Sequence, residues 1–268
     1  IRLQTQLICM NTMTEKPAIQ VFPPGAQGSG AFDGGKITEI KPIPFPQESG
    51  GSDAIGPLFY WAWATANGDG VIPMHPHQGF EIVSYALDGE IGHSDTLGTK
   101  SRVATGGAQV MQTGSGVSHQ EEMFGDRTEF FQIWFEPYLK EAVTREPTYR
   151  EVKDEDFLRQ ETDSGTVVKS IIGGGGPIDL VADVRMIDLT IPANDSHEFV
   201  LGDNRFLAAM TVEGSGAWNS GDGPAEIARE DFSIVENAGS ISVTAGDHGL
   251  RLVAVDGPRQ VNYALYGR

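Results

Sequence analysis

The chain has 268 residues, which is enough for one large β domain or two domains of ordinary size. Its formal net charge of −18 repels phosphate backbones and anionic membranes, and no stretch rich in Lys and Arg offsets it, so we expect no direct binding of nucleic acid. There is no run of 18 apolar residues, so we expect no membrane-spanning helix and no membrane partner. The single cysteine, Cys9, excludes an internal disulfide framework and favours a reducing, cytoplasmic location.

The N-terminal stretch lacks the features of a secretion signal. Residues 1–13 include Arg2 but no apolar core and no small-residue cleavage site. We therefore interpret residues 1–13 as a tail, upstream of a shorter protein that begins at Met10 or Met13.

Short apolar runs separated by Gly, Pro, Asn and Asp predict a turn-rich, all-β protein in two halves. In the first half the predicted strands are residues 17–22, 37–42, 58–65, 80–87, 108–112, 117–122 and 130–135. We interpret residues 137–147 as a connector, with one helical turn at 138–142. In the second half the predicted strands are residues 166–172, 184–191, 196–201, 205–212, 231–236, 240–244 and 249–255. We expect an N-terminal domain at 14–137 and a C-terminal domain at 138–268.

Two histidine-containing pairs predict a metal site. They are His75-Pro76-His77 and His119-Gln120-Glu121, and together they hold 3 of the 6 histidines. Residues i and i+2 of a strand face the same side, so each pair can present two ligand atoms to one point. Three imidazoles and a carboxylate suit iron(II), manganese, nickel, zinc or copper(II), whereas calcium and magnesium prefer oxygen ligands.

The identity of the acidic ligand is open between two glutamates. Glu81 has the same parity as His75 and His77 and would complete an H-x-H-x3-E pattern, while Glu121 lies two residues from His119. Parity alone does not choose between them. We favour Glu121, because a ligand on the same strand as His119 needs no additional bend.

The residues around these pairs resemble the pirin family of the cupin superfamily. The resemblance is strong over residues 57–137 and weaker elsewhere. It is carried by HPHQGFEIVSY at 75–85, LDG at 87–89, HSD at 93–95, Gly98, QVMQTGSGVSHQE at 109–121 and FFQIWFEP at 130–137. The chain stops without the longer C-terminal segment of many pirins, so it is similar to the shorter bacterial pirin-like proteins. The resemblance implies two tandem β-sandwich cupin domains (a bicupin) and one iron-type metal in the N-terminal domain. The implied ligands are His75, His77, His119 and Glu121.

The two halves are similar enough to be a decayed repeat, with LDG at 87–89 matching VEG at 212–214. A second match, of residues 109–119 with 233–243 at an offset of 124, places Val243 opposite His119 and Ala245 opposite Glu121. The offset of 125 from the first match places Val200 opposite His75 and Gly202 opposite His77, although one gap would move these two matches. Val and Ala offer no metal ligand, so we expect one metal per chain and a C-terminal domain without metal. His197 and His248 are interpreted as solvated or core histidines.

The resemblance implies a dioxygenase of the quercetin 2,3-dioxygenase type, with dioxygen and a small, chelating aromatic compound as substrates. In that hypothesis Glu121 is the catalytic base that accepts a phenolic proton. The alternative is an iron- or redox-sensing regulatory protein without turnover. A purely structural site is disfavoured, because structural zinc sites are rich in cysteine. The sequence leaves the oligomeric state open.

Several neighbouring residues have two interpretations. Phe80, Met111 and Trp63 either line an apolar pocket near the metal or belong to the sandwich core. His93 and Asp95, which follow the turn at Asp88-Gly89, are interpreted as surface groups or as partners of the ligands.

Overall fold

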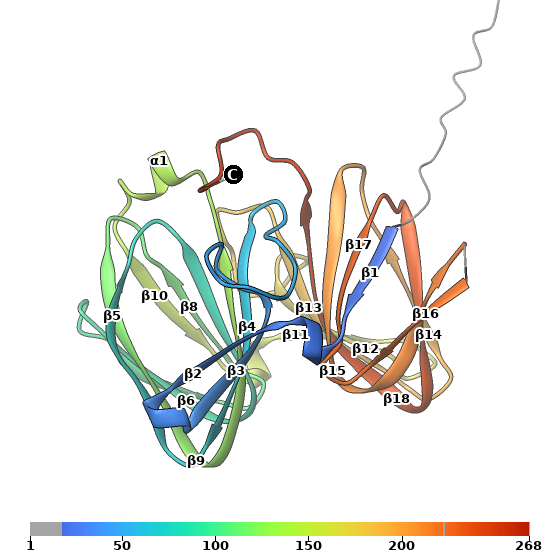
Figure 1. The fold of residues 1–268 in the computed structure, drawn as a ribbon, viewed down its shortest axis with the longest axis horizontal. Coiled ribbons are helices and arrows are strands. Elements are labelled where there is room, and N and C mark those ends of the chain that lie inside the picture. The colour runs from blue at the N-terminus through green and yellow to red at the C-terminus, as the bar shows by residue number, and fades with distance from the viewer. Residues whose placement is uncertain (1–17, 222, 268) are drawn as a thin grey trace, which may run out of the picture.

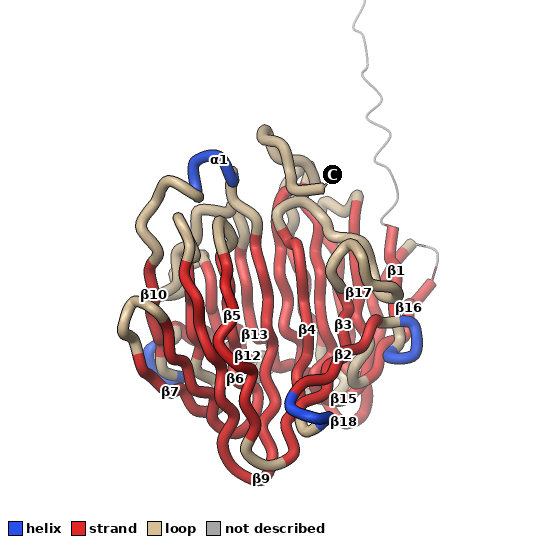
Figure 2. The backbone as a smooth tube through the Cα atoms, turned by 60° about the vertical axis from the view of Figure 1, so that its left-hand side comes forward, coloured by secondary structure: helices blue, strands red, loops and turns tan. Residues whose placement is uncertain are grey.

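The all-β bicupin fold is confirmed by a computed structural model, which describes residues 18–221 and 223–267 (Figure 1). The described chain forms two nine-stranded sheets whose strand pairs are antiparallel. Figure 2 shows the long strands running side by side, with loops gathered at their ends. The predicted tail at 1–13 and Cys9 lie outside the described residues. Among the described residues, no helix is long and apolar enough to cross a membrane.

The first sheet has the order β10-β8-β6-β9-β4-β3-β2, with β5 paired to β9 and β7 paired to β6. Its strands are β2 (Gly28–Phe32), β3 (Ile37–Ile43), β4 (Leu58–Asn67), β5 (Gly70–His77), β6 (Glu81–Asp95), β7 (Lys100–Ala104), β8 (Ala108–Gln112), β9 (Val117–Phe135) and β10 (Thr148–Val152).

The second sheet has the order β1-β17-β15-β18-β13-β12-β11, with β14 paired to β18 and β16 paired to β15. Its strands are β1 (Ala18–Phe22), β11 (Leu158–Glu161), β12 (Val167–Ile172), β13 (Arg185–Ile191), β14 (Ser196–Val200), β15 (Arg205–Ser220), β16 (Gly223–Ala228), β17 (Phe232–Glu236) and β18 (Ser240–Pro258). Four short helices complete the described chain: η1 (Pro24–Ala26), η2 (Asp33–Gly35), α1 (Leu139–Ala142) and η3 (Asp154–Asp156).

The two sheets exchange strands across the middle of the chain. β1 comes from the N-terminal half but pairs with β17, and Figure 1 shows it beside the C-terminal strands. β10 follows the connector but pairs with β8 in the first sheet. The domain boundaries at 13/14 and 137/138 stay a prediction, because sheet membership does not follow a single cut in the chain.

Two pairs of predicted strands are single long strands in the structure. Residues 117–122 and 130–135 belong to β9, and residues 240–244 and 249–255 belong to β18. The register between β6 and β9 shifts near Gly89, which has a φ of 78°. A Cβ atom there would lie 2.6 Å from the carbonyl oxygen of Arg127, so a glycine lets the two strands cross closely.

The strands that the sequence did not predict are short or polar: β2, β5, β7, β10, β11 and β16. Several lie at edges of the sheets or carry Gly and Pro, so their hydrophobic alternation is weak. Strands of this kind become apparent from the strands with which they pair, because their own sequences carry little β-strand signal.

A common apolar core joins the two sheets. It includes fully buried aromatic side chains of the first sheet, such as Trp61 and Phe131, and of the second sheet, such as Phe206 and Phe232. The rings of Trp61 and Phe232 meet edge to face, with their centroids 5.4 Å apart. The first sheet is therefore packed against the second half of the chain. Its strands β5 and β9 carry the predicted histidine ligands.

Candidate metal centre

Strands β5 and β9 bring the three predicted histidine ligands together. His75 pairs directly with His119, and His77 follows His75 on the same face of β5. The pairing is interrupted by a bulge between Ile72 and His75, and Pro76 is tolerated because β5 pairs with β9 alone. One ligand atom from each histidine lies within 4.8 Å of the other two.

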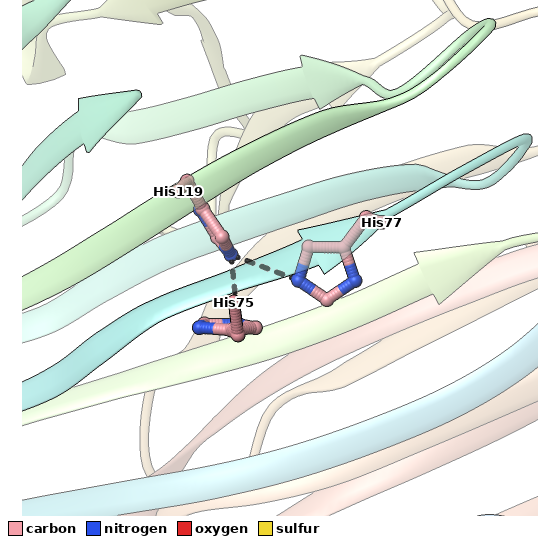
Figure 3. Close-up of side chains that lie close together, drawn as sticks. All are labelled: His75, His77 and His119. Carbon is pink, nitrogen blue, oxygen red and sulfur yellow. Dashed lines mark hydrogen bonds between the residues drawn. The ribbon is translucent and has the colours of Figure 1, made fainter. Parts of the chain in front are cut away.

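The ring nitrogens converge on one point (Figure 3). His119 Nε2 lies 3.0 Å from His77 Nε2 and 3.1 Å from His75 Nε2. His75 Nδ1 lies 2.8 Å from the carbonyl oxygen of Pro73, which can only accept a hydrogen bond. The His75 proton therefore lies on Nδ1, and the lone pair on Nε2 points at the other two rings.

Burial keeps two of these rings neutral. It lowers the pKa of His77 to about 3, with a smaller contribution from the nearby His75. Burial also lowers the pKa of His119 to about 2, and the charges of His77, His75 and His93 act in the same direction. Neutral imidazole nitrogens that face one point at these separations form a donor set that fits a divalent transition metal.

Glu121 is buried on β9, two residues from His119, but is not one of the three clustered groups. Its Oε1 atom accepts a hydrogen bond from Gln132 Nε2 at 2.5 Å, and Ser84 Oγ lies 3.5 Å away. Burial, with a further contribution from the charge of Glu39, raises the pKa of Glu121 to about 7. Its role as the fourth ligand and as the catalytic base stays a prediction.

Glu81, the competing acidic ligand, is occupied by other groups. Its carboxylate accepts hydrogen bonds from Gln112 Nε2 at 2.6 Å, from the Val181 backbone N–H at 2.7 Å and from the Ala182 backbone N–H at 2.9 Å. Glu81 therefore ties β6 to the second half of the chain.

Aromatic side chains line one side of the centre. The Trp134 ring lies edge to face with the His77 ring at a centroid distance of 4.8 Å, and Phe80 packs on Trp134 at 5.7 Å. Met111 is buried in the same cluster as Trp134, whereas Trp63 belongs to the core between the sheets. The sequence did not indicate that Trp134, a residue of β9, lies next to the histidines.

His93 and Asp95 are buried and hydrogen-bonded to each other, which excludes their interpretation as surface groups. His93 Nδ1 lies 3.4 Å from His119 Nδ1, so His93 is a partner of a ligand. Burial lowers the pKa of His93, while the Asp95 carboxylate opposes that effect.

Two cavities differ in their relation to this centre. One of about 460 Å³ opens beside His77 and is lined also by Gln78, Thr96 and Val117. A larger one, of about 650 Å³, lies around Lys169 and Arg251 and has none of the three histidines in its lining. Lys169 pairs with Asp154 and Arg251 with Asp188, so the charges there are already compensated. Of these two cavities, the smaller one has one of the three histidines, His77, in its lining.

The second sheet corrects part of the repeat alignment. His197 pairs with Val243 as His75 pairs with His119, so the counterpart of His75 is His197 and not Val200. By the same register Phe199, and not Gly202, is the counterpart of His77. This comparison takes the match of His119 with Val243 as its premise, and that match stays a prediction. The gap that moves these residues lies between β14 and β18.

A family model described as Pirin matches residues 61–135, which include all three histidines. A pirin-like protein of Caulobacter vibrioides is 32% identical over 54% of this chain and 55% of its own length. A protein of Pseudomonas aeruginosa with the name "Putative quercetin 2,3-dioxygenase" is 30% identical over 69% of this chain and 68% of its own length. The chain thus spans between about half and two thirds of the length of these curated relatives.

The same fold occurs in a solved pirin. The crystal structure of the bacterial pirin YhhW of Escherichia coli in complex with nickel(II) superimposes with a TM-score of 0.74 at 19% identity, over 91% of this chain and 100% of that chain. At this identity the similarity concerns the fold alone.

Proposed function

The chain belongs to the pirin family, and we propose that it is a metal-dependent dioxygenase of the quercetin 2,3-dioxygenase type that acts on a small, chelating aromatic compound. One observation carries the proposal: three imidazole nitrogens converge next to an aromatic wall, and the buried Glu121 lies two residues from His119 on the same strand. The name of the relative from Pseudomonas aeruginosa supports the same reaction class.

His75, His77 and His119 would hold one divalent metal, for which iron(II) is our first choice and manganese, nickel, zinc or copper alternatives. The bound metal supplies a Lewis acid and open positions for substrate and dioxygen. Because the three rings come from one strand pair, their arrangement is set before the metal arrives.

Glu121 is the residue we propose as the base. In the metal-free protein burial raises the pKa of Glu121 to about 7, and a divalent metal nearby would lower it, which favours the carboxylate form that a base needs. The hydrogen bond from Gln132 fixes the carboxylate, and Gln132 in turn accepts one from Trp134 Nε1 at 3.2 Å. The carboxylate would take the phenolic proton of the substrate, while Trp134 and Phe80 exclude water and face the aromatic ring.

The decisive experiment measures metal content and turnover together. Protein purified without oxygen and loaded with iron(II) should consume oxygen in step with the loss of flavonol absorbance. Glu121→Gln should lower the rate more than it lowers flavonol binding, because a base acts in the transition state. Glu161→Gln, on the exposed strand β11, is the matched control.

A fully loaded protein without turnover of a panel of chelating phenols would refute the enzyme. The sensor hypothesis then requires iron(II) and iron(III) forms that differ in partner affinity, since a redox change shifts binding only through such a difference.

A further inference from the structure

His119, His93 and Asp95 form a buried row of hydrogen-bonded side chains that leads away from the metal-facing side of His119. His119 Nδ1 lies 3.4 Å from His93 Nδ1, and His93 Nε2 lies 2.8 Å from Asp95 Oδ2. The pairing of β6 with β9 creates this row, because it sets Asp95 opposite His119 and His93 opposite Glu121. All three residues are buried.

The carboxylate of Asp95 is fixed in place and can only accept hydrogen bonds. Its Oδ1 atom accepts one from the Leu97 backbone N–H and one from the Thr99 backbone N–H, each at 2.9 Å. Its Oδ2 atom is therefore left to accept the proton of His93 Nε2. A neutral imidazole has one proton, so His93 Nδ1 is then an acceptor.

This order of protons determines the tautomer of His119. An acceptor at His93 Nδ1 favours a proton on His119 Nδ1. The lone pair of His119 then lies on Nε2, the atom that faces His75 and His77. The ring of His93 is itself held by Tyr149 of β10, which stacks on it at a centroid distance of 4.1 Å and an angle of 19°.

We propose that Asp95 and His93 are positioning residues that select the metal-binding tautomer of His119. This inference rests on metal binding at the three histidines, the first part of the proposed function, and is independent of the substrate and of turnover. Neither residue touches the metal position, so each acts through His119.

Two substitutions break the proton order with little change in volume. In Asp95→Asn the side-chain amide would donate to His93 Nε2, which moves the His93 proton to Nδ1, facing His119. His93→Phe keeps an aromatic ring on Tyr149 but removes both nitrogens. We expect each to weaken nickel(II) or cobalt(II) binding by about 10- to 100-fold, the usual effect of losing a partner of a metal-bound histidine.

A third substitution should restore what His93→Phe removes. In His93→Gln the amide oxygen can accept from His119 and the amide nitrogen can donate to Asp95, so the proton order is kept. We expect its metal affinity to lie within a few-fold of the wild type. Loss of packing alone would not be repaired by glutamine, which cannot stack as an aromatic ring does.

The test uses the full chain, titrated with nickel(II) and cobalt(II) against a competing chelator, together with the cobalt absorption spectrum. Asp195→Asn is the matched control, since Asp195 also accepts side-chain hydrogen bonds, from Ser164 and Thr166, but in loops next to β12 and β14. Imidazole nitrogen NMR of the metal-free protein adds a direct readout. His119 should carry its proton on Nδ1 in the wild type and in His93→Gln, and on Nε2 in Asp95→Asn.

Weakened affinity in Asp95→Asn and His93→Phe, recovery in His93→Gln and an unchanged Asp195→Asn support the proposal. Wild-type affinity and an unchanged His119 tautomer in Asp95→Asn overturn it, while the metal centre itself stands. A wild-type chain that binds neither metal overturns both, and His119→Ala supplies the zero point for that comparison.

Discussion

Glu81→Gln and Glu121→Gln should have different effects: we expect the first to lower the free energy of unfolding and the second to lower the metal affinity. The Glu81 carboxylate is 2% exposed and accepts three hydrogen bonds, two of them from backbone N–H groups about 100 residues away. In Glu81→Gln one oxygen becomes an NH2 group, which faces a donor and leaves it without an acceptor. An unsatisfied buried donor costs about 1–3 kcal/mol, and the remaining bonds lose the assistance of the charge.

We therefore expect Glu81→Gln to lower the free energy of unfolding by about 2–4 kcal/mol. For a chain of this size that corresponds to a Tm lower by roughly 5–10 °C. The metal content should stay near that of the wild type, because the three histidines do not contact Glu81.

Glu121→Gln should give the opposite result. The amide oxygen can still accept from Gln132, and the pKa of about 7 means that the carboxyl is close to half protonated at neutral pH before the change. The free energy of unfolding of the metal-free protein should change by less than about 1 kcal/mol. Metal affinity and turnover should fall.

Urea unfolding of the metal-free proteins and metal analysis of the loaded ones measure both effects on the same samples, with Glu161→Gln as the surface control. A Glu81→Gln protein that keeps its stability but loses its metal, beside a Glu121→Gln protein that keeps its metal, would show that the ligand assignment is wrong.

Three further outcomes are expected. His75→Ala, His77→Ala and His119→Ala should each lose most of the bound metal in elemental analysis, because each removes one of three ligands. Metal should bind at one equivalent per chain, and His197→Ala should leave this unchanged, since its neighbour across the strand pair is Val243. Because the pKa values of His77 and His119 are lowered in the folded state, the unfolded chain binds protons at these rings first as the pH falls below 6.5. The free energy of unfolding of the metal-free protein should therefore fall between pH 6.5 and pH 3. Urea midpoints at pH 7 and pH 4 should show this loss, with a smaller difference in His77→Ala.

The histidine ligands were predictable because alternation along one strand is a local property. The predicted strands did not include β5, but the H-x-H spacing puts His75 and His77 on one face of any strand that holds them, and the distinctive runs around them resemble the pirin family. The all-β fold followed from frequent turn residues between short apolar runs. Neither the histidine spacing nor the pattern of turn residues depends on which strands pair.

The choice between the glutamates was harder, because parity does not carry from one strand to the next. Gly79, with a φ of 83°, lies in the turn between β5 and β6 and breaks the count from His77 to Glu81. Ser84 contacts Glu121, whereas Glu81 contacts Ala182 of the second half. The path of β6 gives Glu81 partners in the second half of the chain, while the role of Glu121 as a ligand stays a prediction.

The contacts of His93 also depended on strand register. Nothing in the local sequence places Asp95 opposite His119, and the stacking partner Tyr149 comes from β10, a polar edge strand that the sequence did not reveal. Pairings between segments far apart in the chain are set by the whole sheet, so they are lost when each strand is interpreted alone.

The second half of the chain contributes contacts to the first sheet, which carries the histidine cluster. Its backbone at Val181 and Ala182 holds Glu81 at the start of β6, and the same strand carries Ser84, His93 and Asp95 farther along. β10, which follows the connector, forms the outer edge of the first sheet. The loop that holds Glu81 therefore fixes one end of β6, and the register of β6 against β9 brings His93 to His119. The second half of the chain thus has a structural part in the first sheet, whether or not it once held a metal.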